Sequence, residues 1–142
     1  MTESVSGFEE AVCGLLVRSG RVLLVHRNGS RVWAPNCWDA PGGHVELRES
    51  DFDALARELL EELGIVVAAG CTRLVGRLTG SDFDVRVFAV ESWSGDPRNR
   101  APNEHDDLGW FEEEQLASLT LADPDLCPII VKALHHEPGR SR

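Results

Sequence analysis

Residues 43–65 constrain the fold more than any other part of the chain. They predict a helix from about Asp51 to Leu63. Ser50 and Asp53 form an S-x-x-D pattern that is typical of a helix N-terminus, where a side-chain oxygen accepts a hydrogen bond from a backbone N–H. Gly64 predicts the C-terminal end, because glycine readily adopts the left-handed conformation that ends many helices.

The predicted helix has an apolar stripe and an acidic side. At about 100° per residue, one stripe of apolar side chains forms the face that we expect to pack against the core. Its members are Phe52, Leu55, Ala56, Leu59 and Leu63. Three glutamates centre roughly 120° away from the stripe, on a side that is not needed for packing. They are Glu58, Glu61 and Glu62.

The spacing of these glutamates brings their carboxylates together, because residues three and four apart share one helix face. Carboxylates about 5 to 6 Å apart repel by roughly 3 kcal/mol per pair at an effective dielectric near 20. Protons, cations or solvent must relieve that repulsion, and a divalent cation would also supply chemistry. Alternatively, this is a solvated acidic face with an ordinary ion pair between Arg57 and Glu61, which are one turn apart.

The residues before the helix favour the metal site over the solvated face. Pro41-Gly42-Gly43 forms a turn in which glycine lets the backbone approach a ligand or metal closely and leaves a carbonyl oxygen free. A glycine turn followed by a capped acidic helix is a rarer combination than either part alone.

The order of residues in this stretch resembles the full signature of the Nudix hydrolases. It runs Gly43, five residues, Glu49, seven residues, Arg57-Glu58-Leu59, one residue, Glu61-Glu62, one residue, Gly64-Ile65. No defined position of the signature is missing. The resemblance implies an α/β/α sandwich with a mixed β-sheet. It also implies hydrolysis of a nucleoside diphosphate linked to another moiety, with Mg2+ as the cofactor and Mn2+ as a substitute.

The resemblance also implies roles for individual residues. The metal ligands are expected to be the Gly43 carbonyl and the carboxylates of Glu58, Glu61 and Glu62, and Arg57 is expected to orient these acids. Glu49 would either support the loop or bind metal through water.

The general base is expected to be Glu62 or Glu104, and the sequence does not decide between them. Glu104 lies a few residues before Trp110-Phe111, where many Nudix enzymes keep a further acid. The alternative for Glu104 is an exposed loop carboxylate.

Three further residues are candidates for substrate binding. Arg27 ends a predicted strand close to the expected ligand and is a candidate for contact with a substrate phosphate. Trp38 precedes the glycine turn in a W-x-x-P-G-G pattern, which favours a core anchor, with ligand contact as the alternative. His44 follows the turn and is either a phosphate contact or a solvent-exposed side chain. His26 is interpreted as a surface residue at a strand end.

The rest of the chain alternates between strand and turn signals. Strands are predicted at residues 8–17, 21–27 and 83–93, within residues 71–78, and beginning at residue 65. The strand at 83–93 is expected to have both faces partly covered. Residues 94–103 form a polar loop, either a substrate lid or a connection. Short and amphipathic helices are predicted after Glu112 and around residues 129–134. His135-His136 is interpreted as a helix-end pair rather than a metal site, and residues 1–7 and 138–142 as flexible tails.

Composition bounds the class of protein. A chain of 142 residues predicts one domain, 1–142, and a net charge of −10 argues against a nucleic-acid polymer as partner. It does not argue against a small phosphorylated substrate, since bound cations neutralise both sides. No apolar run has the length of a membrane span and the N-terminus lacks a signal-peptide pattern, which predicts a cytoplasmic protein without a membrane partner. A monomer or a homodimer is expected. Four scattered cysteines predict reduced thiols.

The substrate is constrained least. Family subgroups for ADP-ribose and for dinucleoside polyphosphates carry a Pro or a Tyr some 15 to 18 residues beyond the signature. This chain has Gly80-Ser81-Asp82 there, and no tyrosine. A nucleoside triphosphate, with oxidised bases included, is therefore the leading expectation. Nucleotide sugars and ADP-ribose-type compounds are alternatives. A non-catalytic Nudix-like nucleotide sensor would be expected to lose signature acids, and a calcium module to have an Asp/Asn-rich loop.

Overall fold

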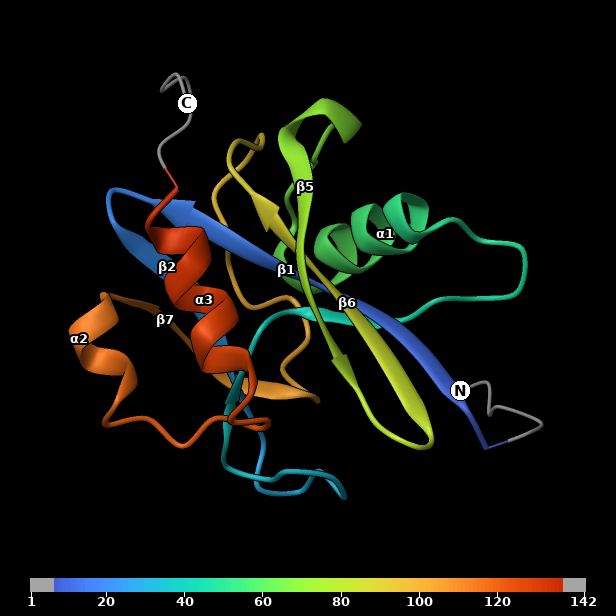
Figure 1. The fold of residues 1–142 in the computed structure, drawn as a ribbon, viewed down its shortest axis with the longest axis horizontal. Coiled ribbons are helices and arrows are strands. Elements are labelled where there is room, and N and C mark those ends of the chain that lie inside the picture. The colour runs from blue at the N-terminus through green and yellow to red at the C-terminus, as the bar shows by residue number, and fades with distance from the viewer. Residues whose placement is uncertain (1–6, 137–142) are drawn as a thin grey trace.

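The computed structural model describes residues 7–136, so the predicted tails lie outside the described residues except for Gly7. Helices cover both faces of a twisted mixed sheet (Figure 1). The strands are β1 (Glu9–Arg18), β2 (Arg21–Arg27), β3 (Trp38–Asp39), β4 (Gly42–His44), β5 (Thr72–Thr79), β6 (Phe83–Val90) and β7 (His105–Phe111). The helices are α1 (Asp51–Leu63), the 3-10 turn η1 (Ala69–Cys71), α2 (Glu113–Leu116) and α3 (Leu126–Leu134).

Strand β1 is the centre of the sheet. The strand order is β3-β2-β1-β6-β5, with β4 also paired to β1 and β7 to β2. The β1–β6 pairing is parallel and runs from Glu9↔Phe83 to Leu16↔Val90, whereas β2 and β4 pair with β1 in antiparallel fashion. This topology confirms the predicted α/β architecture with a mixed sheet. Because β4 carries Gly42 and Gly43, the glycine turn is fixed to the central strand.

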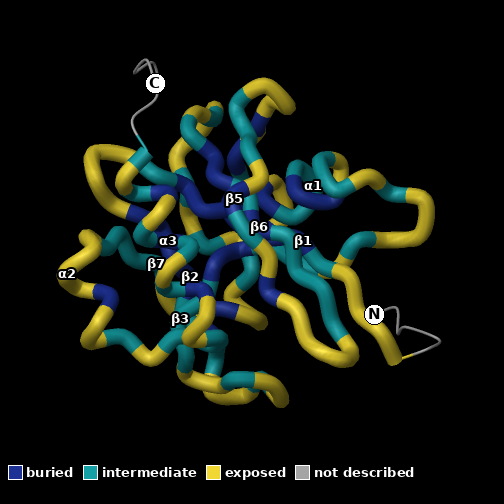
Figure 2. The backbone as a smooth tube through the Cα atoms, viewed as in Figure 1, coloured by how far each residue is buried: buried dark blue, intermediate teal, exposed yellow. Residues whose placement is uncertain are grey.

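Two apolar cores lie on opposite faces of the sheet, because successive side chains of a strand point to opposite sides. Leu15 of β1 belongs to the core beneath α3, and the adjacent Leu16 belongs to the core beneath α1. The predicted alternation of β6 is confirmed, since Val87 and Val90 likewise lie in different cores. Figure 2 shows the buried residues concentrated along the central strands and the facing side of α1.

Helix α1 has the predicted bounds and caps. The Ser50 hydroxyl accepts a hydrogen bond from the Asp53 N–H at 3.0 Å. Gly64 has a φ of 74° and donates its N–H to the Leu60 carbonyl. On the predicted apolar stripe, the three leucines are fully buried, while Phe52 and Ala56 are partly buried against the same core.

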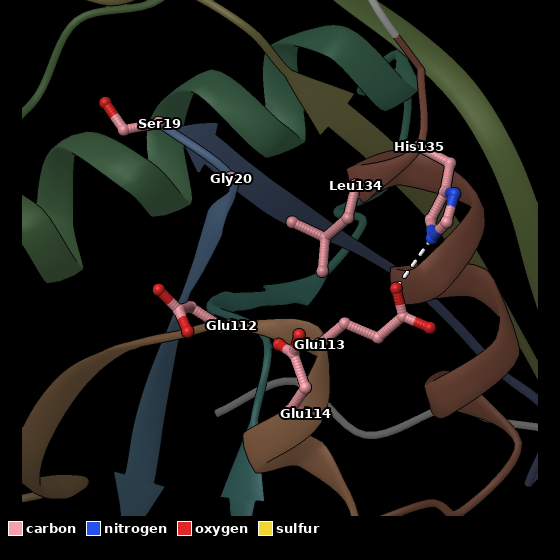
Figure 3. A pocket seen from close by; sticks show the side chains of 7 residues that line it. All are labelled: Ser19, Gly20, Glu112, Glu113, Glu114, Leu134 and His135. Carbon is pink, nitrogen blue, oxygen red and sulfur yellow. Dashed lines mark hydrogen bonds and ion pairs between the residues drawn. The ribbon is translucent and has the colours of Figure 1, made fainter.

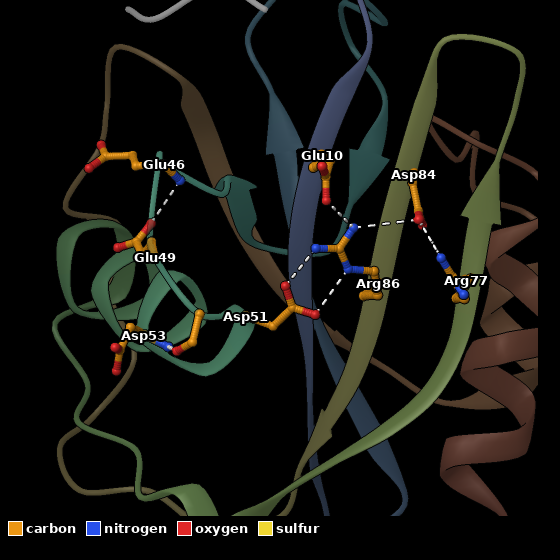
Figure 4. A network of polar contacts seen from close by, with 9 residues as sticks. Glu10, Glu46, Glu49, Asp51, Asp53, Arg77, Asp84 and Arg86 are labelled. Atoms are coloured by element: carbon orange, nitrogen blue, oxygen red, sulfur yellow. Dashed lines mark hydrogen bonds and ion pairs between the residues drawn. The ribbon is translucent and has the colours of Figure 1, made fainter.

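A network of charged side chains holds the N-terminus of α1 to the sheet (Figure 4). Arg86 of β6 donates to both carboxylate oxygens of Asp51, at 2.6 and 3.0 Å, and to Glu10 at 3.1 Å. Its side chain is only 13% exposed and also lies 3.5 Å from Asp84. Arg86 therefore joins β1, β6 and α1 at one point.

Two of the predicted strands were wrong in extent. Residues 65–67 form no strand; Val66 exchanges two hydrogen bonds with Ser94 as an isolated bridge. Ile65 and Val67 are buried because they pack beneath α1, and an apolar run alone does not distinguish such packing from strand pairing. The strand predicted at 83–93 ends at Val90, after which Trp93 stacks on Trp110.

The C-terminal predictions hold. Glu112 caps a short helix through a capping box with Gln115, and α3 begins at Leu126 with Pro128 in its first turn. All four cysteines are free. Within residues 7–136, no helix combines the length and apolar character that crossing a membrane requires.

The closest backbone approach in the site region involves Gly42 and yields a stability prediction. A Cβ at position 42 would overlap the Val12 carbonyl oxygen and lie 2.6 Å from the Cys13 Cα, and neither backbone atom can move away cheaply. We expect Gly42→Ala to lower the free energy of unfolding by more than about 3 kcal/mol. The control is Gly70→Ala, where a Cβ meets nothing within 4 Å. Equal urea midpoints for the two variants would contradict the prediction.

Candidate metal and active site

The backbone at Gly43 lies directly against the carboxylate of Glu58. Strand β4 places Gly43 opposite Val12 of β1, and α1 packs beside it. A Cβ at position 43 would be 2.5 Å from the nearest Glu58 carboxylate oxygen. A side chain at this position would therefore displace the Glu58 carboxylate from the strand.

Arg57 holds the acids of α1 in a fixed arrangement. Its guanidinium donates to Glu58 Oε2 at 2.9 Å and to the His44 carbonyl at 3.0 Å, which ties the helix to the end of β4. The Oε1 of Glu61, one turn later, lies 3.5 Å away. These contacts fit the predicted orienting role.

Glu49 is paired with the same guanidinium through two parallel hydrogen bonds. Arg57 donates to its two oxygens at 2.8 and 2.9 Å, and this pairing lowers the pKa of Glu49 to about 2. One oxygen also accepts the Glu46 N–H at 2.9 Å, which closes the loop before α1 (Figure 4). The geometry matches the loop-supporting alternative, while metal binding by Glu49 stays a prediction.

Glu62 is buried, so the three glutamates of α1 do not form one solvated acidic face. Glu62 is 3% exposed, whereas the side chain of Glu61 is 60% exposed. The loop before β7 is bound to the backbone of Glu62, where the Arg100 N–H donates to the Glu62 main-chain carbonyl at 2.8 Å. Burial, followed by the hydrogen bond and charge of Glu58, raises the pKa of Glu62 well above its ordinary value. Its Oε1 is buried and has no hydrogen-bond partner among the described residues.

His105, at the start of β7, is a site residue that the sequence did not predict. It is 5% exposed, and its Nε2 lies 4.0 Å from Glu62 Oε1. Burial, followed by the charges of Arg31 and Arg27, lowers the pKa of His105 to about 4, so the ring is neutral at pH 7. The polar run 103–107 resembles an exposed loop, and only the pairing of β7 with β2 buries this ring.

Glu104 remains on the surface beside the site. Its side chain is about half exposed, with Oε1 3.8 Å from Arg31. Its negative charge contributes to the raised pKa of Glu62, so the two carboxylates lie within electrostatic range. The structure therefore brings Glu104 near the signature acids, and its role as ligand or base stays a prediction.

The guanidinium of Arg27 is committed to its own loop. It donates to the carbonyls of Trp33, at 2.6 and 3.0 Å, and of Ala34, at 3.1 Å, and lies over the Trp33 ring. Contact between Arg27 and a substrate phosphate stays a prediction. Asp39 lies 4.0 Å from Arg27, and burial raises its pKa to about 6. The sequence patterns did not single out Asp39.

The two remaining substrate candidates differ in exposure. Trp38 is partly buried and makes edge contacts with Phe111 and His26, which fits the core-anchor interpretation. His44 is half exposed, and its Nε2 is 2.9 Å from a Glu9 carboxylate oxygen. His135 and His136 are paired with carboxylates of Glu113 and Glu91 and lie away from the signature acids.

The donor atoms at this site fit a hard divalent cation. The set consists of carboxylate and carbonyl oxygens, which Mg2+ and Mn2+ prefer. Within residues 7–136, no three acidic, histidine or cysteine side chains converge closely enough to hold an ion as they stand. Glu61 is exposed and can turn toward Glu58, and the unpaired Glu62 Oε1 is an oxygen without a protein partner. We therefore take the residues to fit the metal that the signature implies.

A separate hollow lies away from this site and contains none of the signature residues. It has a volume of about 640 Å³ and lies between the β1–β2 turn, α2 and the end of α3 (Figure 3). It is lined by Ser19, Gly20, Glu112, Glu113, Glu114, Leu134 and His135. Its acids make two ion pairs, Glu113 with His135 and Glu112 with Arg21.

Known proteins are similar to this chain in both sequence and fold. The NUDIX domain model matches residues 7–130. CTP pyrophosphohydrolase of Escherichia coli strain K12 is 31% identical over 119 residues, covering 82% of this chain and 85% of that protein. "Putative 8-oxo-dGTP diphosphatase 2" of Mycobacterium tuberculosis is 36% identical over 111 residues, covering 74% of each.

Two further comparisons differ in coverage. The m7GpppN-mRNA hydrolase NUDT17 of Danio rerio is 44% identical over 73 residues, but these cover 49% of this chain and only 24% of that protein. The crystal structure of a MutT NUDIX hydrolase from Burkholderia pseudomallei superposes with a TM-score of 0.72 at 29% identity, covering 88% of this chain and 96% of that one. This chain therefore belongs to the Nudix hydrolase family and is a pyrophosphohydrolase of that family.

Proposed function

We propose that this protein hydrolyses a phosphoanhydride bond of a nucleoside triphosphate, with oxidised bases included, in a reaction that depends on Mg2+. One observation carries the proposal. Glu58 lies against the glycine strand with Glu62 buried beside it, and the pair leaves one carboxylate oxygen without a protein partner. Excess negative charge of this kind is compensated when a divalent cation binds together with a diphosphate.

Each residue of the site has a role in this proposal. Glu58, Glu61, Glu62 and the Gly43 carbonyl hold the metal. When bound, the metal neutralises charge on the diphosphate oxygens and lowers the pKa of the attacking water. Arg57 keeps Glu58 in place through its 2.9 Å hydrogen bond.

Glu62 is proposed as the general base, because it is buried beside Glu58 and burial raises its pKa well above the ordinary value, which makes its carboxylate a stronger base. Glu104 is more exposed and faces Arg31, and it serves as the alternative base. A pH–rate profile of Glu104→Gln separates the two. An acidic limb that is kept and moves slightly to lower pH supports Glu62, because the substitution removes a charge that raises the pKa of Glu62. Loss of the acidic limb transfers the role to Glu104.

The substrate class is supported by two relatives whose names specify nucleoside triphosphates, one CTP and the other 8-oxo-dGTP. Nucleotide sugars, ADP-ribose-type compounds and a binding function without catalysis are the alternatives. Capped RNA, named for NUDT17, is less favoured because a net charge of −10 repels a polyanion. Cytoplasmic location and a monomeric or homodimeric state stay predictions.

A nucleotide panel tests the proposed function. We expect Mg2+-dependent product release to be fastest with a nucleoside triphosphate such as CTP or 8-oxo-dGTP, slower with ADP-ribose or a nucleotide sugar, and abolished by EDTA. Phosphate detection after treatment with inorganic pyrophosphatase measures the rate. Tight nucleotide binding without turnover would favour the sensor instead.

Glu61→Gln is expected to reduce kcat by about 100-fold or more while leaving stability unchanged. Its carboxylate is exposed, and exposed acids contribute little to folding. The loss reflects removal of a charged metal ligand, so it persists at saturating nucleotide. Glu114→Gln, an exposed acid of α2, is the control. Wild-type turnover in Glu61→Gln would refute the ligand assignment.

Glu62→Gln is expected to change how stability depends on pH. The pKa of Glu62 is higher in the folded state than in the unfolded state, so its contribution to the free energy of unfolding is fully present below the unfolded-state pKa. That contribution is lost as the pH rises through the folded-state pKa. In EDTA, the variant should therefore gain stability over wild type from pH 5 to pH 8, on the order of 1–3 kcal/mol. Added Mg2+ should narrow the difference by stabilising wild type. Urea unfolding measures both, and a pH-independent difference would contradict the burial of a charged group.

Arg57→Lys is expected to lower kcat by about 10- to 100-fold, because lysine cannot make the two parallel bonds to Glu49 while also holding Glu58. Arg77→Lys removes a comparable arginine–carboxylate pair, with Asp84, away from the site and serves as control. Steady-state kinetics of both variants, with circular dichroism to verify folding, make the comparison. Equal kcat values would show that the arginine fork is dispensable.

A further inference from the structure

Two polar side chains at the back of the site face each other without a completed hydrogen bond. Glu62 Oε1 and His105 Nδ1 are both buried and unpartnered among the described residues. The other ring nitrogen, His105 Nε2, is 4.0 Å from Glu62 Oε1, about 1 Å beyond hydrogen-bond distance. Because buried polar atoms in native proteins are almost always paired, the unpartnered Glu62 Oε1 indicates a contact that is completed in the working site.

The backbone of His105 is fixed from both sides. Its N–H donates to the Ala101 carbonyl at 3.0 Å, and its carbonyl accepts the Asn99 side-chain amide at 2.7 Å. Its register on the sheet is opposite Arg27 of β2. The backbone that carries the ring is therefore held in place. The terminal torsions of histidine and of glutamate are both broad, so small rotations of the two side chains close the gap at little cost.

Among the lysine, arginine and histidine side chains described by the structure, His105 alone lies within 4.0 Å of a Glu62 carboxylate oxygen. Arg57 already donates to Glu49, Glu58 and the His44 carbonyl. Glu58 carries a negative charge like that of Glu62 and repels it. The backbone N–H of Gly42 lies close enough to the Glu62 carboxylate to lower its pKa. A second donor is needed to fix both the position and the rotation of a carboxylate.

We propose that His105 is a positioning residue that donates its Nε2–H to Glu62 Oε1 and so orients the Glu62 carboxylate for metal binding and water activation. The inference rests on the proposed function. Donation from Nε2 is available to one neutral tautomer and to the cation, so it does not depend on the charge of the ring. A carboxylate has about four lone-pair sites, so the remaining ones stay available for the reaction. Partners of this kind behind a ligand typically change metal affinity or activity by about 10- to 100-fold.

Two amide substitutions separate the hydrogen bond from the burial of the ring. The amide nitrogen of Gln occupies a position comparable to Nε2, whereas that of Asn reaches only the position of Nδ1. We expect His105→Asn to lower kcat about 10-fold or more with an unchanged KM for the nucleotide, and His105→Gln to keep kcat within about 3-fold. His135→Asn, an exposed histidine of the same type beside the remote hollow, is the control.

Metal affinity gives a readout that needs no turnover. Electron paramagnetic resonance measures the affinity for Mn2+ in the absence of nucleotide. We expect this affinity to fall about 10-fold in His105→Asn and by less than about 2-fold in His105→Gln. Thermal unfolding in EDTA tests whether either substitution acts through the fold. Equal losses of kcat and Mn2+ affinity in both variants would assign His105 a purely structural role and overturn the inference.

The remaining outcomes separate the inference from the function beneath it. Turnover by wild type together with wild-type kcat and Mn2+ affinity in His105→Asn would overturn the positioning role alone. If wild type neither binds Mn2+ nor hydrolyses any nucleotide of the panel, the proposed function fails and the inference fails with it. Rescue by Gln but not by Asn, in both kcat and Mn2+ affinity, supports the inference.

Discussion

The ion pairs of Arg57 are the interaction on which the site depends. Several carboxylates are gathered at one end of the sheet, and their repulsion would separate them without a cation nearby. The guanidinium binds Glu49 on the loop, Glu58 on the helix and the His44 carbonyl on β4. One positive group thus joins three segments of chain while it compensates part of their charge. The uncompensated remainder makes the site suited to a metal.

The surrounding fold makes this arrangement rigid. Gly42 lets the β4 backbone touch β1 at a separation that no Cβ would permit, and Gly43 leaves room for the Glu58 carboxylate beside the strand. The N-terminus of α1 is anchored through Arg86 and Asp51 to the same sheet. Groups on strands and helices are held more precisely than groups on loops, so β4 and α1 fix the backbone positions from which the acids extend.

The back of the site has a different character. Burial makes charge unfavourable on both Glu62 and His105, raising the pKa of the acid and lowering that of the base. Glu61, its neighbour in the signature, remains in solvent. Adjacent glutamates therefore differ in environment, and a cation bound between them would contact one solvated acid and one that the protein has already desolvated.

The sequence by itself determined the helix, its caps and the identity of the acids, because these depend on local spacing: Ser50 and Gly64 set the ends, and the three- and four-residue intervals set the acidic side. It also determined the alternation of β6. Only the tertiary structure decided that Glu62 is buried, that His105 lies beside it and that residues 65–67 pack without pairing. Those outcomes depend on which distant segments cover them, the loop before β7 and the register of β7 on β2. Local periodicity carries no information about such long-range contacts.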